Sequence, residues 1–218
     1  MVTLTPQRHR ERIAGSEVIE RDRIGPKVLL LPDGTLAKLF RRRRGLSTDR
    51  LYPYSLRFVR NARRLRRQGV ATLAVRERYR VPGERLDVVV YQPLPGRSLK
   101  QICLAQPGRF DATMAARLGA FIAELHRAGI FFRSLHLGNI LALETGGFGL
   151  IDVADMRFQP WPLTRGQRVR NFRHLVRMKA GKEPVRARAD ALLAGYLGET
   201  SQPSRRLRRQ LDDLLARW

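Results

Sequence analysis

The sequence predicts an α+β fold in two lobes, the first rich in strands and the second mainly helical. Three observations predict it. Short apolar or alternating segments fill the chain up to residue 92, helical periodicity dominates after residue 111, and the breaker cluster PLPGRS at 93–98 separates the two regions. We therefore divide the chain into an N-terminal lobe (1–92), a connector (93–97) and a C-terminal lobe (98–218). A length of 218 residues allows two small lobes with a substantial apolar core.

The N-terminal lobe contains five predicted strands, three before one helix and two after it. The second and third strands surround the tight turn PDG at 32–34, which predicts a hairpin, and the helix ends at Gly69. Its apolar positions 58, 59, 62 and 65 follow helical spacing, which leaves an arginine-rich outer face. The predicted strands are EVIERD (17–22), KVLLL (27–31), TLAKLF (35–40), TLAVRERYRV (72–81) and RLDVVVYQ (85–92), and the helix spans 54–69.

The C-terminal lobe begins with a long helix, for which Asp111 is the expected N-cap and Gly129 the end. Two short strands should follow, NILAL (139–143) and FGLIDV (148–153), joined by ETGG. The remaining pattern is helical over 165–180, 186–197 and 204–217.

Charge is the unusual feature of the composition. The chain has 43 Lys and Arg against 19 Asp and Glu, a formal net charge of +24. Such a field attracts polyanions: nucleic acid, anionic lipid or a phosphorylated substrate. A nucleic-acid-binding protein is disfavoured, because no helix-turn-helix, zinc or RNP-like motif is present and aromatic residues make up only 7% of the chain. The arginine clusters 41–44, 63–67 and 205–209 are either solvated faces or contacts to anionic inner-leaflet lipids, where each basic residue contributes about 1 kcal/mol.

Cysteine content and hydropathy point to a cytoplasmic protein that can associate peripherally with the inner membrane. Cys103 is the single cysteine, so no intramolecular disulfide can form, and we expect this thiol to pack in the core. The N-terminal residues lack an apolar signal region, and no apolar run approaches the ~18 residues of a membrane span.

Two polar residues flank the predicted hairpin of the second lobe. Asn139 lies where the chain enters the first strand, and Asp152 lies where the second strand ends, so their side chains can converge. An amide oxygen and a carboxylate are hard ligands of the kind that Mg²⁺ takes alongside phosphates. The alternative is that both residues only bond backbone amides in turns, as Asn and Asp often do.

These residues belong to motifs that resemble a known superfamily. LHLGNIL and, twelve residues on, LIDVAD resemble the catalytic loop and the metal-binding loop of the protein-kinase-like fold. The wording D-L-H-x-G-N-I is typical of its small-molecule and sugar kinases. The chain looks most similar to bacterial lipopolysaccharide kinases, which phosphorylate heptose or Kdo sugars of the inner core, and to their relatives called toluene tolerance proteins. The resemblance extends over about residues 15–200.

The resemblance implies a bilobal protein-kinase-like fold that uses ATP and Mg²⁺. Asn139 and Asp152 would hold the metal and bridge the phosphates. Lys38 in LAKLF matches the strand lysine that neutralises the nonreacting phosphates, although a solvated strand lysine is the alternative.

The resemblance also implies roles for the connector and for the loop cation. YQPLPG resembles the hinge that holds adenine, with Gln92 offering its backbone carbonyl and Leu94 both its N–H and its carbonyl. Pro93 has no N–H to offer, but it falls at the hinge position that faces outward. Arg133 matches the usual arginine of the catalytic loop.

Three departures from the pattern affect the expected activity. First, Ser134 replaces the catalytic aspartate, and Phe132 replaces the preceding histidine. Second, no acidic residue occurs between Leu51 and Gln68 to pair with the strand lysine, and Asn61 is the nearest match. Third, no G-x-G-x-x-G lies near Gly25. Ser134 can orient a hydroxyl but is not basic at neutral pH. His136 could accept the proton instead, or it could be structural and bond loop backbone groups.

Two functions remain open at this point. The first is an ATP- and Mg²⁺-dependent kinase that phosphorylates a lipopolysaccharide core sugar or another anionic glycolipid. The second is a pseudokinase that binds nucleotide or a partner in envelope assembly without turnover. The lost base and the lost helix carboxylate favour the second function. Retention of the lysine and both metal residues favours the first, because a pure scaffold needs no magnesium ligands.

Overall fold

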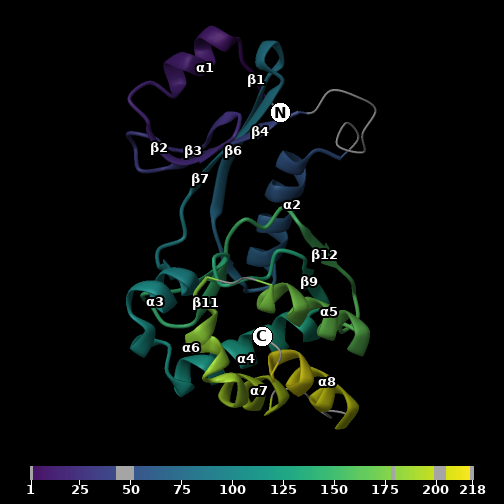
Figure 1. Ribbon diagram of the computed structural model, residues 1–218. Coiled ribbons are helices and arrows are strands. Elements are labelled where there is room, and N and C mark those ends of the chain that lie inside the picture. Colours follow the sequence, from purple (N-terminus) through teal and green to yellow (C-terminus); the bar gives the residue numbers. More distant parts are fainter. Residues whose placement is uncertain (1, 43–51, 178–179, 199–204, 217–218) are drawn as a thin grey trace. The chain divides into compact units, whose positions relative to one another are not determined.

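The structure is a computed structural model that describes residues 2–42, 52–177, 180–198 and 205–216. The chain forms two compact units, unit 1 (Met1–Leu94) and unit 2 (Pro95–Trp218) (Figure 1). Unit 1 is built on a sheet with one main helix, and unit 2 is mainly helical with short strands. The predicted α+β class is therefore confirmed. The division between the units falls within the predicted connector at 93–97, and the role of that connector as a hinge stays a prediction.

Unit 1 contains a six-stranded sheet in the order β1-β6-β7-β4-β3-β2. All neighbours are antiparallel except β1 and β6, which are parallel. The elements are β1 (Val2–Thr3), α1 (Pro6–Arg12), β2 (Glu17–Asp22), β3 (Gly25–Leu30), β4 (Leu36–Arg41), α2 (Tyr54–Arg67), β5 (Ala71–Thr72), β6 (Ala74–Val81) and β7 (Leu86–Gln92). The predicted strands and the predicted helix are present, whereas β1, α1 and β5 were not predicted.

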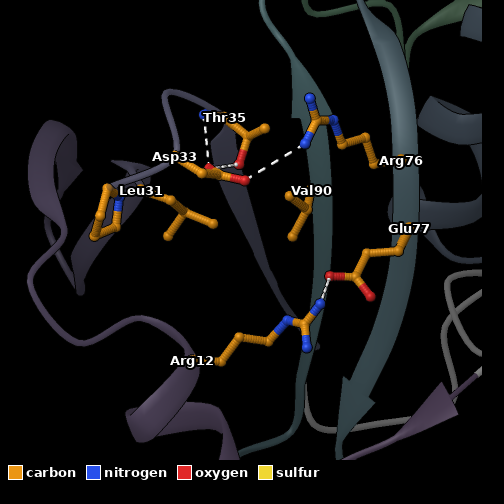
Figure 2. Close-up of a pocket in the computed structure, with 8 residues that line it drawn as sticks. Arg12, Leu31, Asp33, Thr35, Arg76, Glu77 and Val90 are labelled. Atoms are coloured by element: carbon orange, nitrogen blue, oxygen red, sulfur yellow. Dashed lines mark hydrogen bonds and ion pairs between the residues drawn. The ribbon is translucent and has the colours of Figure 1, made fainter.

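Helix α1 was missed because it has almost no apolar periodicity. Its N-cap is Thr5, whose hydroxyl accepts a hydrogen bond from the N–H of Arg8 at 3.3 Å, and Pro6 follows at the first helical position. Polar contacts join it to β6: His9 Nδ1 lies 3.1 Å from the Tyr79 hydroxyl, and Arg12 forms an ion pair with Glu77 (Figure 2). Tertiary contacts of this kind leave no pattern in the sequence.

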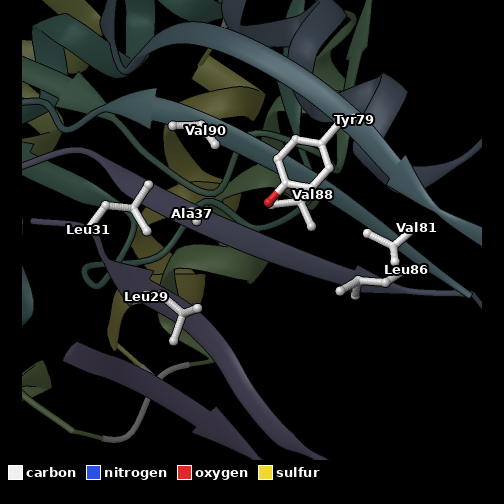
Figure 3. Close-up of a cluster of buried hydrophobic side chains, with 8 residues drawn as sticks. All are labelled: Leu29, Leu31, Ala37, Tyr79, Val81, Leu86, Val88 and Val90. Carbon is white, nitrogen blue, oxygen red and sulfur yellow. The ribbon is translucent and has the colours of Figure 1, made fainter. Parts of the chain in front are cut away.

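The sheet of unit 1 has two differently used faces. One face carries a cluster of buried apolar side chains (Figure 3): Leu29, Leu31, Ala37, Tyr79, Val81, Leu86, Val88 and Val90. On the opposite face Phe58 of α2 packs against Phe40 and Tyr91, with ring centroids 5.6 Å away in both cases. Because side chains alternate along a strand, Lys38 of β4 points to the α2 side together with Phe40.

The described part of unit 2 contains six α-helices and five short strands. Its short strands form two groups, β11-β10-β8 and the pair β12-β9, all antiparallel. The elements are β8 (Arg97–Ser98), α3 (Leu99–Ala105), α4 (Ala112–Arg127), β9 (Ile130–Phe132), β10 (Ile140–Ala142), β11 (Phe148–Leu150), β12 (Met156–Phe158), α5 (Arg165–Val176), α6 (Lys182–Arg186), α7 (Ala189–Gly198) and α8 (Arg205–Ala216).

Several predicted boundaries in unit 2 were wrong. The second strand ends at Leu150 rather than at 153, the helix predicted over 186–197 is α7, which begins at Ala189, and α6 before it was not predicted. Helix α3 was missed, although the Ser98 side chain caps it and Gln101 completes a capping box. Asp111 caps α4 as predicted, since it accepts a hydrogen bond from the N–H of Met114 at 2.7 Å. Residues 178–179, 204 and 217 of the predicted helices, and 43–44 of the first arginine cluster, lie outside the described residues.

Helices α4 and α7 approach each other closely through two glycines. A Cβ added at Gly195 would lie 1.9 Å from the backbone oxygen of Ala116, and one added at Gly119 would lie 2.0 Å from that of Leu192. We expect Gly195→Ala to destabilise unit 2 by about 3 kcal/mol, because the two backbones must separate. Gly198→Ala is the matched control on the same helix, since no atom lies within 4 Å of its added Cβ. Equal thermal midpoints for the two variants would contradict this account of the packing.

Candidate functional site

The topology of unit 2 places the two predicted motif loops side by side. One loop, residues 133–139, leads from β9 to β10, and the other, residues 151–155, leads from β11 to β12. Since β9 pairs with β12 and β10 pairs with β11, both loops run between the same two strand pairs. Two backbone bonds join them at their ends: Ile151 N–H to the oxygen of Asn139 and Arg133 N–H to the oxygen of Asp155, each at 3.0 Å.

The first loop is held by apolar side chains and by one bond to a helix. Leu135, Leu137 and Ile140 are fully buried. The backbone oxygen of Leu137 accepts a hydrogen bond from Lys100 N–H of α3 at 3.0 Å. The polar residues of this loop therefore sit in a framework of buried neighbours, which accounts for the irregular alternation of apolar and polar residues in FFRSLHLGNIL.

The Asn139 side chain is oriented by its own loop. Its amide nitrogen Nδ2 donates to the Ser134 backbone oxygen at 3.0 Å and lies 3.1 Å from His136 Nε2. None of the hydrogen bonds that Asn139 makes to the described residues uses its amide oxygen Oδ1. Asn139 Nδ2 therefore holds the loop through hydrogen bonds, and Oδ1 is a potential metal ligand.

Asp152 lies in the neighbouring loop, next to the residue that bonds Asn139. Its φ of +53° is in the left-handed region, which Asp tolerates better than most residues and which cannot continue a strand. This backbone conformation explains why β11 ends three residues earlier than predicted.

The two side chains suit a magnesium ion that is shared with phosphates. No group of three His, Cys, Asp or Glu residues that could enclose a metal occurs in the described part of the chain. Mg²⁺ needs no such group, because it commonly takes one or two protein oxygens and completes its shell with waters and substrate phosphates. Asn139 Oδ1 and the Asp152 carboxylate are oxygens of this type, and the ion would supply charge neutralisation for bound phosphates.

His136 is used inside the loop. Its Nδ1 accepts a hydrogen bond from Gly138 N–H at 3.2 Å, and its Nε2 faces the Asn139 amide. Burial lowers the pKa of His136, and Lys100 lowers it further, against an opposing effect of Asp152. A neutral imidazole accepts a hydrogen bond at only one nitrogen, so one of these two groups donates to the ring, and both ring nitrogens face groups of the loop. The ring is therefore suited to holding the loop rather than to receiving a substrate proton.

Ser134 and Arg133 present different groups to their surroundings. The Ser134 backbone oxygen holds Asn139, whereas its hydroxyl has no hydrogen-bond partner among the described residues. The exposed Arg133 side chain approaches the Asp155 carboxylate, with Nη1 and Oδ1 3.6 Å apart. Ser134 is therefore available to orient a hydroxyl, and Arg133 contributes to joining the two loops.

A buried network that was not anticipated supports the start of the first loop. Asn171 of α5 donates through Nδ2 to the Phe132 backbone oxygen at 2.6 Å, so its Oδ1 faces His126 Nε2 at 3.0 Å. His126 Nε2 must then carry the proton, and Nδ1 accepts from the Tyr196 hydroxyl at 2.9 Å. Burial lowers the pKa of His126 to about 3, which keeps the ring neutral. No role was assigned to His126 from the sequence, since a helical histidine carries no signal of such partners.

Lys38 of unit 1 is buried beside aromatic rings. Its exposed fraction is 7%, and Nζ lies 5.3 Å from the Phe58 ring centroid of α2 and 5.8 Å from that of Phe40. Helix α2 contains no acidic residue, and Asn61 on its buried side is an amide. The lysine is therefore placed in an electron-rich aromatic setting in which cation–π attraction stabilises its charge.

A buried carboxylate on the sheet fixes the start of α2. Asp87 of β7 accepts from the Ser55 hydroxyl at 2.6 Å and pairs with Arg78 and Arg80 of β6, each at 2.8 Å. Burial alone would raise the pKa of Asp87, but the hydrogen bonds from Arg80, Ser55 and Arg78 outweigh it and lower the pKa. This network joins helix to sheet without a lysine–glutamate pair.

The connector residues and the cysteine are the remaining residues considered in the sequence analysis. Gln92 ends β7, and its side-chain oxygen accepts from Arg76 at 2.8 Å, which leaves the predicted backbone contact to adenine unaffected. Leu94 is the last residue of unit 1 and is half-buried. Cys103 is buried, as expected, and burial raises the pKa of its thiol to about 11. Such a thiol is not a nucleophile at neutral pH.

Two pockets lie away from these residues. One, of about 480 Å³, is in unit 1 between two ion pairs, Arg12–Glu77 and Arg76–Asp33, and has Leu31 and Val90 in its wall (Figure 2). The other, of about 570 Å³, is in unit 2 between α3 and α6. Neither is lined by a predicted site residue.

Comparisons with known proteins give a distant likeness in structure and none in sequence. No family model and no curated protein matches the chain. The similar solved structures include a 2.2 Å crystal structure of WbdD and a medium-resolution structure of WbdD, a bifunctional kinase-methyltransferase. Both are 18% identical over 87% of this chain, with TM-scores of 0.48 and 0.49. The chain spans under half of their length, 47% and 46%.

Similarity at this level does not identify an activity or a substrate. The assignment of a kinase-like fold rests on the order of elements: a sheet with one helix between its strands, a helical unit, and two motif loops between paired short strands. None of the helices in the described ranges has the length and apolar character of a membrane span.

Proposed function

We propose that the chain is an ATP- and Mg²⁺-dependent phosphotransferase of the lipopolysaccharide kinase type. The observation that carries the proposal is the Asn139 side chain, whose nitrogen is fixed by Ser134 and His136 while its oxygen stays available beside the Asp152 loop. In this proposal Asn139 and Asp152 hold Mg²⁺, Lys38 neutralises the phosphates, and the backbone of Gln92 and Leu94 holds adenine. The acceptor is a sugar hydroxyl of an inner-core or similar anionic glycolipid at the cytoplasmic face of the membrane.

The chemistry does not require a strong base. Phosphoryl transfer proceeds through a loose transition state in which positioning and charge neutralisation supply most of the rate. Ser134 would orient the acceptor hydroxyl, whose proton can leave late to solvent. General-base assistance typically adds ~10²- to 10⁴-fold, so its loss makes a slow enzyme rather than none.

Two substitutions separate the roles in the first loop. We expect Ser134→Asp to raise kcat by at least about tenfold if the serine is a degraded base position, with the KM for ATP unchanged. We expect His136→Ala to raise the KM for ATP, since Asn139 loses its neighbour, and to leave the pH profile of kcat unchanged. Radiolabelled phosphate transfer to core lipopolysaccharide measures both. A flattened pH profile in His136→Ala would instead assign the proton transfer to this histidine.

A pseudokinase is the second candidate, and two observations favour it. Ser134 stands at the base position, and α2 contains no carboxylate to pair with Lys38. In that case Mg²⁺ and ATP would bind without transfer, and the protein would act through a partner in envelope assembly. Transfer by the wild-type chain decides between the two. Membership of the toluene tolerance subgroup is part of the proposal and would make solvent tolerance an indirect result of a better cross-linked outer membrane.

A further inference from the structure

The three arginine clusters differ in how far their charge is compensated. In the first, Arg41 donates to the Pro26 backbone oxygen at 2.6 Å and approaches Asp22 at 3.4 Å. In the third, α8 carries Asp212 and Asp213, and Arg208 lies 3.8 Å from Asp212. Helix α2 has six arginines in its sequence YSLRFVRNARRLRR and no acidic residue at all. The charge of α2 is thus the least compensated within its own element.

These arginines form one continuous face, which we call the α2 basic face. It consists of Arg57, Arg60, Arg63 and Arg67, which fall within about a third of the helix circumference at 100° per residue, and of Tyr52 and Tyr54 at its N-terminal end. The other side of the helix is buried through Phe58, Ala62 and Leu65. Arg60, Arg63 and Arg67 are exposed and Arg57 is half-buried, along a helix of 14 residues that is marked α2 in Figure 1.

Arginines at this spacing weaken the helix when nothing anionic is near. Like charges three or four residues apart destabilise a helix, and the arginines before the last turn do not gain from the helix dipole. Arg60 and Arg63 are in that position. A surface that costs stability in the isolated chain is best explained by a partner that removes the repulsion.

Two exposed tyrosines indicate which class of anionic partner the α2 basic face binds. Tyr52 and Tyr54 are 42% and 45% exposed. The Arg57 guanidinium lies 4.5 Å from the Tyr54 ring centroid, and the Arg60 guanidinium lies 5.4 Å from that of Tyr52. Amphipathic rings beside basic side chains are typical of surfaces at the headgroup level of a bilayer. Single-stranded nucleic acid is instead bound in grooves by rings that offer their faces to bases, whereas here a guanidinium already occupies one face of each ring.

We propose that the α2 basic face docks on an anionic lipid bilayer, with the tyrosines at headgroup level and the arginines against lipid phosphates. This deepens the proposed function, because a glycolipid acceptor lies in a membrane, and it rests on that function for its biological role. Its test is independent of phosphate transfer.

The test is sedimentation of the full chain with vesicles of phosphatidylcholine, with and without phosphatidylglycerol. We expect Arg60→Gln/Arg63→Gln/Arg67→Gln to weaken binding to anionic vesicles on the order of 100-fold, since each basic side chain contributes roughly fivefold. The matched control is Arg205→Gln/Arg206→Gln/Arg209→Gln on α8, which removes the same charge from exposed positions and should keep most of the binding. Tyr52→Ser/Tyr54→Ser should remove the binding that persists at high salt.

Several outcomes would overturn the proposal. Equal loss in the α2 and α8 variants would show that net charge alone acts. No vesicle binding by the wild-type chain, or binding of single-stranded RNA through α2 in place of vesicles, would reject the bilayer as the partner. Calorimetry with Mg²⁺ and ATP on the same samples distinguishes failure of one proposal from failure of the other. Vesicle binding without nucleotide binding rejects the proposed function alone. Nucleotide binding without vesicle binding rejects only the proposal that the α2 basic face binds a bilayer.

Discussion

Asp152→Asn should weaken Mg²⁺–ATP binding by at least ~100-fold. Substituting a residue that only hydrogen-bonds to a metal ligand already lowers metal affinity about 10- to 100-fold, and Asp152 is proposed as a ligand itself. Asparagine tolerates the left-handed backbone at φ +53°, so the substitution removes the charge and keeps the loop. Calorimetry with ATP and Mg²⁺ measures the loss directly. In a thermal melt, ATP at about 100 times its Kd stabilises the wild-type chain by about 2.7 kcal/mol, and the variant should show none of this gain.

Asp155→Asn is the matched control for this prediction. Asp155 is a carboxylate three residues on in the same loop, and it approaches Arg133, with Nη1 and Oδ1 3.6 Å apart. Its amide variant should bind Mg²⁺–ATP as the wild-type chain does. If both variants bind alike, the metal role of Asp152 is wrong and its conformation is only that of a turn.

Asp87→Ala should destabilise unit 1 by about 3 kcal/mol, the lower end of the cost of breaking a buried ion pair. The substitution leaves Arg78 and Arg80, 14% and 26% exposed, without their shared carboxylate and releases the Ser55 hydroxyl at the start of α2. Glu20→Ala is the control, because its ion pair with Lys27 is much more exposed and its loss should cost under about 1 kcal/mol. Urea denaturation provides both values, and similar midpoints would contradict the role given to the Asp87 network.

The pH dependence gives an independent check that does not require Asp87→Ala to fold. The folded-state pKa of Asp87 is lowered, so its contribution is present above the ordinary carboxyl pKa of about 4 and is lost as the pH falls through the lowered value. Asp87→Asn, which keeps the size of the side chain, should lack this part of the acid-induced loss of stability. An unchanged acid profile would mean that the carboxylate is not stabilised in the folded state.

The sequence contained enough information for the main elements of the fold. Apolar periodicity located α2 and α4, and the cap Asp111 and the turn PDG set boundaries because they act through local bonds. Helices α1 and α6 were missed; α1 is held by His9 and Arg12 through contacts with β6. Contacts between distant residues leave no periodic signal.

The candidate site was likewise predictable only where residue type and local motif carry the signal. Asn139 and Asp152 could be selected because their types and the motif around them suggest a metal, and the strand pairing explains why their loops run together. The use of His136 inside the loop, and the chain from Tyr196 through His126 and Asn171 to Phe132, depend on side chains up to 70 residues apart. Such partners become visible only in three dimensions.

The central claim is that this chain transfers phosphate from ATP. The most direct measurement is the transfer of radiolabelled γ-phosphate to core lipopolysaccharide by the wild-type chain. The account predicts slow, Mg²⁺-dependent labelling of the glycolipid that is absent in Asp152→Asn and present in Asp155→Asn. Intact Mg²⁺–ATP binding with no labelled product would contradict it and would identify the protein as a nucleotide-binding pseudokinase.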